Sequence, residues 1–385
     1  MNHQEKYACL QLALTPYIGA ETFLRLWQHF GSAEAALNAG LSAVKPFFKR
    51  ADAAAAWQSA EAKQAADLAL AWEEKHHNAR LLLICDEDYP AILSEGMTPP
   101  PLLFARGQLS CLNHAAIAVV GSRHATPQAM RIARDFGSAL SARGICVVSG
   151  MADGIDAAAH EGALTEQGST IAVWGTGIDR VYPARNKQLA ERIAEKGLIL
   201  SEFPLGTRPI AGNFPRRNRI IAGLSQAVLV AEAALASGSL ITARLAAEMG
   251  REVMAIPGSI DNPHSKGCHA LIKQGAKLVE NLDDILEECP ALLRLPENIQ
   301  AATVNHNKAK AEPAEKSEEK SAIESEAEPA QTSPLLKQMG YDPIHPDELA
   351  QQLDISAADV HAELTLLALD GKIAAVGGGR YQRVK

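Results

Sequence analysis

Hydrophobic residues in the first part of the chain recur at the spacing of an α-helix. They form two runs on either side of a turn at residues 16–19, and their members are Leu10, Leu12, Leu14, Phe23, Leu24, Leu26, Trp27, Phe30, Ala35, Ala36 and Leu37. An alanine-rich segment over residues 51–72 follows and predicts one long helix. The pattern therefore predicts an all-helical module over residues 1–78.

From residue 79 the pattern changes to short apolar runs that alternate with amphipathic segments. The apolar runs predict strands at residues 81–85, 102–105, 117–121, 146–150, 170–175, 198–202, 227–232, 253–258 and 277–280. Continuously apolar strands separated by helices are typical of a parallel sheet that is covered on both faces. We therefore expect an α/β fold over residues 79–295, an extended Rossmann-like doubly wound parallel sheet. Such folds bind ligands beyond the carboxyl ends of their strands.

The last part of the chain contains a polar segment and then a second small pattern. Residues 296–333 are rich in Ala, Glu, Lys and Ser and have few large apolar residues, which predicts a flexible linker. Residues 334–385 show three helical runs at 335–339, 346–353 and 357–369. Two strands, at 372–376 and 380–384, flank a turn of three glycines. This order predicts a winged-helix domain.

The net charge of −8 is unevenly distributed along the chain. Residues 1–113 hold 9 basic and 12 acidic residues, residues 114–280 hold 18 and 14, and residues 281–385 hold 10 and 19. The three segments therefore carry −3, +4 and −9. Because local charge decides which partners bind, the basic middle segment remains compatible with an anionic ligand.

Composition also bears on where the protein works. No apolar stretch approaches the roughly 20 residues needed to cross a bilayer, so no membrane insertion is expected. The N-terminus lacks the residue order of a secretion signal. The six cysteines are isolated, without a CxxC pair, which predicts buried thiols in a reducing cytoplasm. No metal-ligand spacing stands out, and we expect no cofactor.

The segment GNFPRRNRIIAG at residues 212–223 carries the strongest electrostatic signal. Pro215 suits the first position of a helix, and Asn213 before it is a possible cap. Arg216, Arg217 and Arg219 would then lie at the positively polarised helix end, where each cation costs a few tenths to about 1 kcal/mol. We therefore expect an anionic ligand to compensate, such as a run of phosphates.

On a helical wheel, these three arginines fall into two groups with different expected roles. Arg217 falls in line with the apolar residues Ile221 and Leu224, and we expect it to act structurally by pairing with Glu202 or Glu232. Arg216 and Arg219 flank the apolar stripe and are the better candidates to bind phosphate.

Further candidates lie where a parallel sheet would place its ligand. Arginine, hydroxyl and backbone N–H groups bind phosphate oxygens, and an aromatic ring stacks on a nucleobase. The candidates are the turn Gly121, Ser122 and Arg123, the turn Ser237, Gly238 and Ser239, the cations Arg185, Lys187 and Lys266, and the ring of Phe214.

A glycine-rich loop at residues 149–156 leaves two readings open. One reading is a nucleotide loop with Asp156 and His160 as catalytic or metal-binding groups. The other is a tight turn shaped by Gly150 and Gly154, with an aspartate as helix cap. We favour the turn.

These motifs together resemble the DNA-processing protein A family (DprA, also called Smf). The resemblance rests on VVGSR, GIDAAAH, GTGIDRVYPARN, NFPRRNRIIAGLS, SGSLITARLA, AIPGS and GCHALIKQGAKLV, in this order between residues 119 and 279. It implies a cytoplasmic bacterial protein that binds and protects single-stranded DNA during natural transformation. It also implies loading of RecA recombinase, a homodimer through the α/β domain, and no catalysis.

The flanking modules and one loop qualify this resemblance. The first module resembles a SAM-like or helix-hairpin-helix unit, but its turn lacks a second glycine and neighbouring cations. Packing or partner contact is therefore favoured over DNA contact. The third helix of the winged-helix module carries Asp359, Glu363 and Asp370 without lysine or arginine, which predicts protein contacts. Asp153 is acidic where the family often has a basic residue.

The leading hypothesis is therefore a non-enzymatic, sequence-independent binder of single-stranded DNA. The alternative is a nucleotide-processing Rossmann enzyme, such as a nucleoside monophosphate phosphoribohydrolase, with Asp156, His160 or Glu232 as acid or base. A transcription factor would rest on the winged helix alone. The exposed side of residues 239–250 is the candidate contact surface for RecA.

Overall fold

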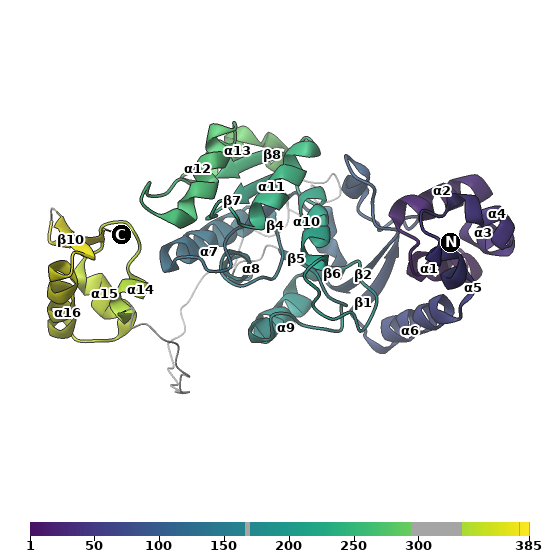
Figure 1. Ribbon diagram of the computed structural model, residues 1–385, viewed down its shortest axis with the longest axis horizontal. Helices are drawn as coiled ribbons and strands as arrows, with labels where there is room; N and C mark the ends of the chain where they lie inside the picture. The colour runs from purple at the N-terminus through teal and green to yellow at the C-terminus, as the bar shows by residue number, and fades with distance from the viewer. Residues whose placement is uncertain (166–169, 294–332, 377, 385) are drawn as a thin grey trace, which may run out of the picture. The chain divides into compact units, whose positions relative to one another are not determined.

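The computed structural model describes residues 1–165, 170–293, 333–376 and 378–384 (Figure 1). It divides into two compact units, Met1–Arg294 and Leu295–Lys385. The linker expected at residues 296–333 lies outside the described residues except for Ser333. Among the described residues, no helix is both long and apolar enough to cross a membrane.

The chain begins with short helices that surround a small apolar centre. They are α1 (His3–Leu14), α2 (Ala20–Phe30), α3 (Ala33–Asn38), α4 (Leu41–Val44), α5 (Asp52–Gln58) and α6 (Glu61–Lys75). The prediction of a single helix over residues 51–72 was wrong. Ser59 is extended, and its hydroxyl donates to the Ala56 carbonyl at 2.9 Å and accepts from the Glu61 N–H at 3.3 Å. Because these local bonds replace helical ones, α5 ends there and α6 begins anew.

A nine-stranded sheet follows, in the order β1-β2-β6-β5-β4-β3-β7-β8-β9. The strands are β1 (Ala79–Leu83), β2 (Leu102–Gly107), β3 (Ala116–Val120), β4 (Cys146–Ser149), β5 (Thr170–Trp174), β6 (Leu198–Ser201), β7 (Ala227–Val230), β8 (Glu252–Ala255) and β9 (Lys277–Leu278). The β1–β2 and β2–β6 pairs are antiparallel, and all other pairs are parallel. The prediction of an extended, mostly parallel sheet is confirmed.

Helices cover both faces of this sheet because the inner strands are apolar on both sides. In β3, Ile117 and Val119 pack with the helices α7 (Pro127–Ala142), α8 (Ile155–Ala163) and α13 (Leu282–Glu288). Ala118 and Val120 point to the opposite face, where they pack with α10 (Asn213–Gly223), α11 (Ser239–Glu248) and α12 (Lys266–Lys273). The helix α9 (Lys187–Lys196) packs near β5 and β6. The result is a three-layer α/β structure.

The chain reverses its direction of winding at β3. The helices α7, α8 and α9 lead from β3 through β4 and β5 to β6, and α10 then returns the chain to β7 on the other side of β3. The loops after β3 and β7 therefore leave the sheet in different directions. A doubly wound sheet has its ligand crevice at such a switch point, at the carboxyl ends of the strands.

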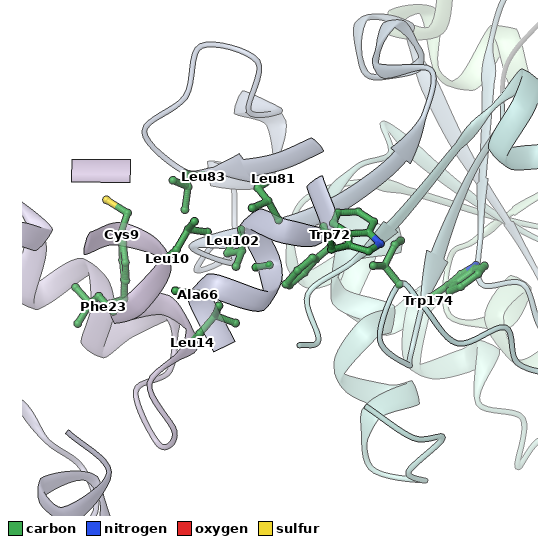
Figure 2. Close-up of a cluster of buried hydrophobic side chains, with 14 of the residues drawn as sticks. Cys9, Leu10, Leu14, Phe23, Ala66, Trp72, Leu81, Leu83, Leu102 and Trp174 are labelled. Atoms are coloured by element: carbon green, nitrogen blue, oxygen red, sulfur yellow. The ribbon is translucent and has the colours of Figure 1, made fainter. Parts of the chain in front are cut away.

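The helical module packs directly on the antiparallel end of the sheet. Leu10, Leu14, Phe23 and Trp72 join the sheet residues Leu81, Leu83, Leu102 and Trp174 in one buried cluster (Figure 2). The rings of Trp72 and Phe104 meet edge to face, with their centroids 5.7 Å apart. At the turn after α1, Arg50 places its guanidinium 4.8 Å from the centre of the exposed Tyr17 ring. Arg50 is thus a cation beside the turn at residues 16–19, although it is distant from that turn in the sequence.

The second unit folds around its own apolar cluster. It contains α14 (Pro334–Gln338), α15 (Pro346–Leu353), α16 (Ala357–Leu369), β10 (Ile373–Val376) and β11 (Arg380–Arg383). Its core includes Leu335, Leu349, Leu364 and Ile373, and the two strands pair antiparallel. Three helices followed by a hairpin confirm the winged-helix arrangement.

The shared cluster predicts that the helical module and the sheet stabilise each other. Leu10→Ala should lower the free energy of unfolding of the first unit by about 2–5 kcal/mol, because Leu10 is fully buried in that cluster. Leu68→Ala is the matched control, since Leu68 is 62% exposed and should cost less than about 0.5 kcal/mol. All four tryptophans lie in this unit, so their fluorescence during urea denaturation measures the difference. Equal stability of the two variants would contradict a shared core.

Candidate nucleic-acid interface

A cavity of about 730 Å³ lies at the carboxyl ends of β3 and β7. Its wall comes mainly from the loop after β3, the start of α10, the loop after β7 and the start of α11. Further lining residues come from the start of α8 and from other loops. The lining includes Gly121, Ser122, Arg123, His124, Tyr182, Phe214, Arg217, Asn218, Ser237, Gly238, Ser239, Thr242 and His264. The structure thus brings eight of the fourteen predicted site residues together at the point where the winding of the sheet reverses.

Backbone packing fixes the loop after β3. A Cβ atom on Gly121 would lie 2.5 Å from Ile155 Cγ1 and 2.8 Å from the Glu232 carbonyl oxygen, so a larger residue does not fit without movement. The Ser122 N–H donates to that same Glu232 carbonyl at 2.7 Å, and the Ser122 carbonyl accepts from the Ile155 N–H at 3.2 Å. These contacts hold Arg123 at the rim of the cavity.

The helix α10 begins earlier than expected. It starts at Asn213 after Gly212, and no side-chain hydrogen bond caps it. Asn213 is a buried residue of the first turn, and Pro215 occupies the third helical position, which corrects the expected cap at Asn213. A proline is still compatible with this position, because N–H groups in the first turn have no helical acceptor.

Arg217 points into the protein and joins three segments. It is 3% exposed, and its Nη1 donates to the carbonyl oxygens of Gly150 and Val173. Asp156 supplies the nearby negative charge, while burial lowers the pKa of Arg217 to about 10. The prediction that Arg217 pairs with Glu202 or Glu232 was wrong. The Nε–H of Arg217 has no hydrogen-bond partner among the described residues.

The loop at residues 149–156 wraps around this arginine. The carboxylate of Asp156 accepts from the N–H groups of Gly150 at 3.1 Å and Ala152 at 3.3 Å. Burial raises the pKa of Asp156, and the charge of Arg217 acts in the opposite direction. Asp156 therefore closes a tight turn, as favoured from the sequence, while it also borders the cavity. The expected aspartate cap was wrong, because Gly154 precedes α8 and no side chain caps that helix.

The other two acid–base candidates have structural partners away from the cavity wall. His160 is fully buried, and its Nδ1 lies 2.7 Å from the Thr170 hydroxyl oxygen. Burial lowers the pKa of His160 to about 3, so its ring is neutral at pH 7. Glu232 accepts from the Thr126 N–H at 3.1 Å and the Thr126 hydroxyl at 2.8 Å. Among the described residues, no cluster of three His, Cys, Asp or Glu side chains could hold a metal ion.

The two flanking arginines of α10 have different surroundings. Arg219 forms an ion pair with Glu202 and donates to the Thr98 carbonyl at 3.0 Å, and it does not line the cavity. This corrects the expectation that Arg219 is free to bind phosphate. Arg216 is exposed, with its guanidinium 5.5 Å from the centre of the Phe203 ring. It is therefore available to an anion outside the cavity wall.

Aromatic rings form one side of the cavity. The guanidinium of Arg123 lies 5.4 Å from the centre of the Phe214 ring, and the centre of the Tyr182 ring lies 5.5 Å from the same point. Tyr182 is 45% exposed, so part of its surface is accessible to a ligand. Tyr182 was not among the residues predicted for the site, although it occurs in one of the family motifs. His124, Asn218, Thr242 and His264 were missed as well.

The start of α11 provides hydroxyl and amide groups. The hydroxyl oxygens of Ser237 and Ser239 lie 2.7 Å apart, and the Ser239 N–H lies 3.3 Å from the Ser237 hydroxyl. A Cβ atom on Gly238 would meet no atom within 4 Å, so this turn is open on its outer side.

Three predicted cations lie away from the cavity wall. Arg185 is paired with Asp153, Lys187 is exposed at the start of α9, and Lys266 donates to the Ile260 carbonyl. The structure therefore does not place these cations in the cavity, although each remains at the surface. The acidic charge of Asp153 is itself neutralised by Arg185.

Known proteins resemble this chain in both sequence and fold. The model of the DNA recombination-mediator protein A family matches residues 80–290, which is more than half of the chain. The chain belongs to this family. A DprA-like N-terminal HHH domain and a DprA winged helix domain match residues 3–63 and 312–379.

Individual members of the DNA recombination-mediator protein A family agree with this assignment. Protein Smf of Escherichia coli is 40% identical over 328 residues, which cover 84% of this chain and 82% of that protein. The X-ray structure of DNA processing protein A from Streptococcus pneumoniae covers 74% of this chain and 98% of its own, with a TM-score of 0.66 and 39% identity. A structure that describes the single-stranded DNA binding mode of DNA processing protein A from Helicobacter pylori covers 56% of this chain and 97% of its own. Its TM-score is 0.50 and its identity 30%.

The two glycines of the cavity predict opposite responses to alanine. Gly121→Ala should lower the free energy of unfolding by about 1–3 kcal/mol, because the new methyl group meets Ile155 and a carbonyl oxygen. Gly238→Ala should leave it unchanged or raise it by up to about 1 kcal/mol, since φ is −63° and the space is open. Urea denaturation measures both values. A Gly121→Ala variant as stable as the wild type would show that the β3 loop is not tightly packed.

Proposed function

We propose that this protein binds single-stranded DNA, independently of base sequence and without catalysis, in the cavity at the switch point. One observation carries the proposal: the Phe214 ring lies close to both the Arg123 guanidinium and the Tyr182 ring, and all three residues line one cavity. Stacking of bases on aromatic rings, together with cations along the backbone, is how proteins hold single strands without reading their sequence.

The electrostatics of the cavity support an anionic ligand. Arg123 and Arg217 both border it, and Arg123 contributes to the lowered pKa of Arg217 because two cations there repel each other. A phosphate beside them would relieve this repulsion. It would also offer an acceptor to the unpartnered Nε–H of Arg217 and to the hydroxyl groups of Ser237 and Ser239.

The geometry favours binding over nucleotide hydrolysis. Asp156 is held by two backbone N–H groups and by the charge of Arg217, and its carboxylate serves the turn. His160 and Glu232 are bonded to Thr170 and Thr126 and do not border the cavity. A general acid or base must reach the proton that it transfers, which neither His160 nor Glu232 does from this position.

The wider role follows from family membership. We propose that the protein protects single-stranded DNA and loads RecA recombinase onto it during natural transformation, as a cytoplasmic homodimer through the α/β domain. The family's description as a recombination mediator and the single-stranded DNA binding mode described for the Helicobacter pylori protein support this role. For RecA we propose the outer side of α11, where Arg244, Ala247 and Glu248 are exposed.

We further propose that the winged-helix unit serves protein contacts. Its third helix, α16, exposes Leu366 to 63% and Leu369 to 80%. Asp359 is exposed on the same helix and Asp370 directly after its end, and the helix has no lysine or arginine. Acidic groups repel a phosphate backbone, and apolar groups do not bind one. Both kinds of group can contact a protein partner.

Substitutions at the cavity test the binding site. Arg123→Ala and Phe214→Ala should each weaken binding of fluorescein-labelled oligothymidine, Phe214→Ala by about 1–3 kcal/mol because it removes a stacking surface. Arg123→Ala should also reduce the dependence of affinity on salt, since one fewer phosphate is neutralised. The matched control is Arg185→Ala, which removes an arginine that pairs with Asp153 outside the cavity wall. Fluorescence anisotropy titrations measure all three.

Two outcomes would contradict the proposal. If the Arg123→Ala/Phe214→Ala double variant bound DNA with wild-type affinity, the cavity would not be the binding site. Release of free base from nucleoside monophosphates by the wild-type protein would favour the enzyme instead.

A further inference from the structure

A buried arginine in the cavity wall has hydrogen-bond donors that the protein does not use. Arg217 lines the cavity although it is 3% exposed. Its Nη1 donates to the carbonyl oxygens of Gly150 and Val173, whereas Nε and Nη2 have no acceptor among the described residues. The nearby carboxylate of Asp156 accepts from two backbone N–H groups instead. Because a buried charge with free donors is costly, a ligand with acceptor oxygens would stabilise this arrangement.

The start of α11 is a second positive group in the same wall. Ser237, Gly238 and Ser239 line the cavity, and the helix of ten residues begins there without a side-chain cap and without an acidic residue in its first turn. The positive end of the helix dipole therefore has no anion from its own first turn. Asn218, which follows Arg217, donates from its side-chain amide to the Gly238 carbonyl at 3.3 Å and ties α10 to this turn. An incompletely bonded guanidinium and an uncapped helix start thus border one cavity.

The size and the lining of the cavity suit a single nucleotide. Its volume of about 730 Å³ lies within the range of small-ligand sites. Phe214 and Tyr182 offer ring surfaces to a base, while the donors of Arg217 and of the α11 start suit a phosphate.

A phosphate at the end of a strand fits these donors better than one within a strand. An internal phosphate has one negative charge and two free oxygens, because its other two oxygens are bonded to sugars. A terminal phosphate monoester has a charge of about −1.5 to −2 at pH 7 and three strong acceptor oxygens. Arg123, Arg217 and the α11 start are the positive groups of the lining, and Asp156 is its acidic side chain. The surplus of positive charge therefore favours the monoester.

We propose that the cavity holds the end of a single strand, with a terminal phosphate monoester at Arg217 and the start of α11 and the last base against Phe214. This inference rests on the proposed binding of single-stranded DNA and narrows it, because the ligand of the cavity becomes a strand end. The chemistry of the monoester is the same at a 5′ and at a 3′ end, so the experiment separates the two.

The test compares oligothymidines of equal length that carry a 5′-phosphate, a 3′-phosphate, two hydroxyl ends, or no ends because they are circular. Each competes with an internally fluorescein-labelled strand for the full-length protein, and fluorescence anisotropy reports the affinity. We expect at least one phosphorylated strand to bind about tenfold more tightly than the hydroxyl-ended strand, because hydrogen bonds to a charged group are strong. The circular strand should bind no more tightly than the hydroxyl-ended one.

A carboxylate at the start of α11 tests where the phosphate lies. Gly238→Asp should remove the preference for the phosphorylated strand, because the new charge repels the monoester. The helix should stay folded, since a Cβ atom at this position meets no atom within 4 Å and aspartate favours a helix start. The matched control is Ala247→Asp, which adds the same charge at an exposed position of α11 outside the cavity lining and should keep the preference. Urea denaturation checks that both variants are folded.

The possible failures of the two proposals are distinguishable. Equal affinity for all four strands would overturn the end-binding inference and leave the proposed binding of single-stranded DNA intact. No measurable binding of any strand would contradict the proposed function itself. A folded Gly238→Asp variant that keeps the preference would also overturn the inference, because the phosphorylated end would then bind elsewhere.

Discussion

The site depends on the burial of one cation, Arg217. Its guanidinium joins the start of α10 to the carbonyl oxygens of Gly150, after β4, and Val173, in β5, beside the carboxylate of Asp156. Breaking such a buried pair by removing one partner typically costs about 3–5 kcal/mol, because an uncompensated charge remains. The close fit extends to Gly150, where any side chain would collide with this guanidinium. The contact fixes where α10 begins over the strand ends.

Once Arg217 is fixed, the remaining residues of the arginine-rich segment take separate roles. Phe214 lies three positions earlier, which sets its ring against Tyr182 and Arg123. Arg219 turns to Glu202, and Arg216 stays exposed. A helix start with three cations thus becomes one structural arginine, one ion pair and one exposed charge. The cavity receives its accessible cation mainly from Arg123, on another loop.

The strands of the sheet were predictable because continuous apolar runs leave few alternatives, and nine such runs correspond to nine strands. The inward direction of Arg217 followed from its place in the apolar stripe of α10. The hydrogen-bond partners of Arg217 could not be predicted, because Gly150 and Val173 come close to it only through tertiary folding. For the same reason the Arg219–Glu202 pair and the Tyr182–Phe214 contact escaped prediction. The break at Ser59 depends on local hydrogen bonds within a segment whose alanines favour a continuous helix.

The central claim is that a cavity of cations and aromatic rings binds single strands in preference to duplex. The most direct measurement is a titration of the wild-type protein with single- and double-stranded DNA of equal length over a range of salt concentrations. The account predicts tighter binding of the single strand, because only its bases are free to stack, with an affinity that falls steeply as salt rises. Equal affinity for both forms, or an affinity that does not depend on salt, would contradict it.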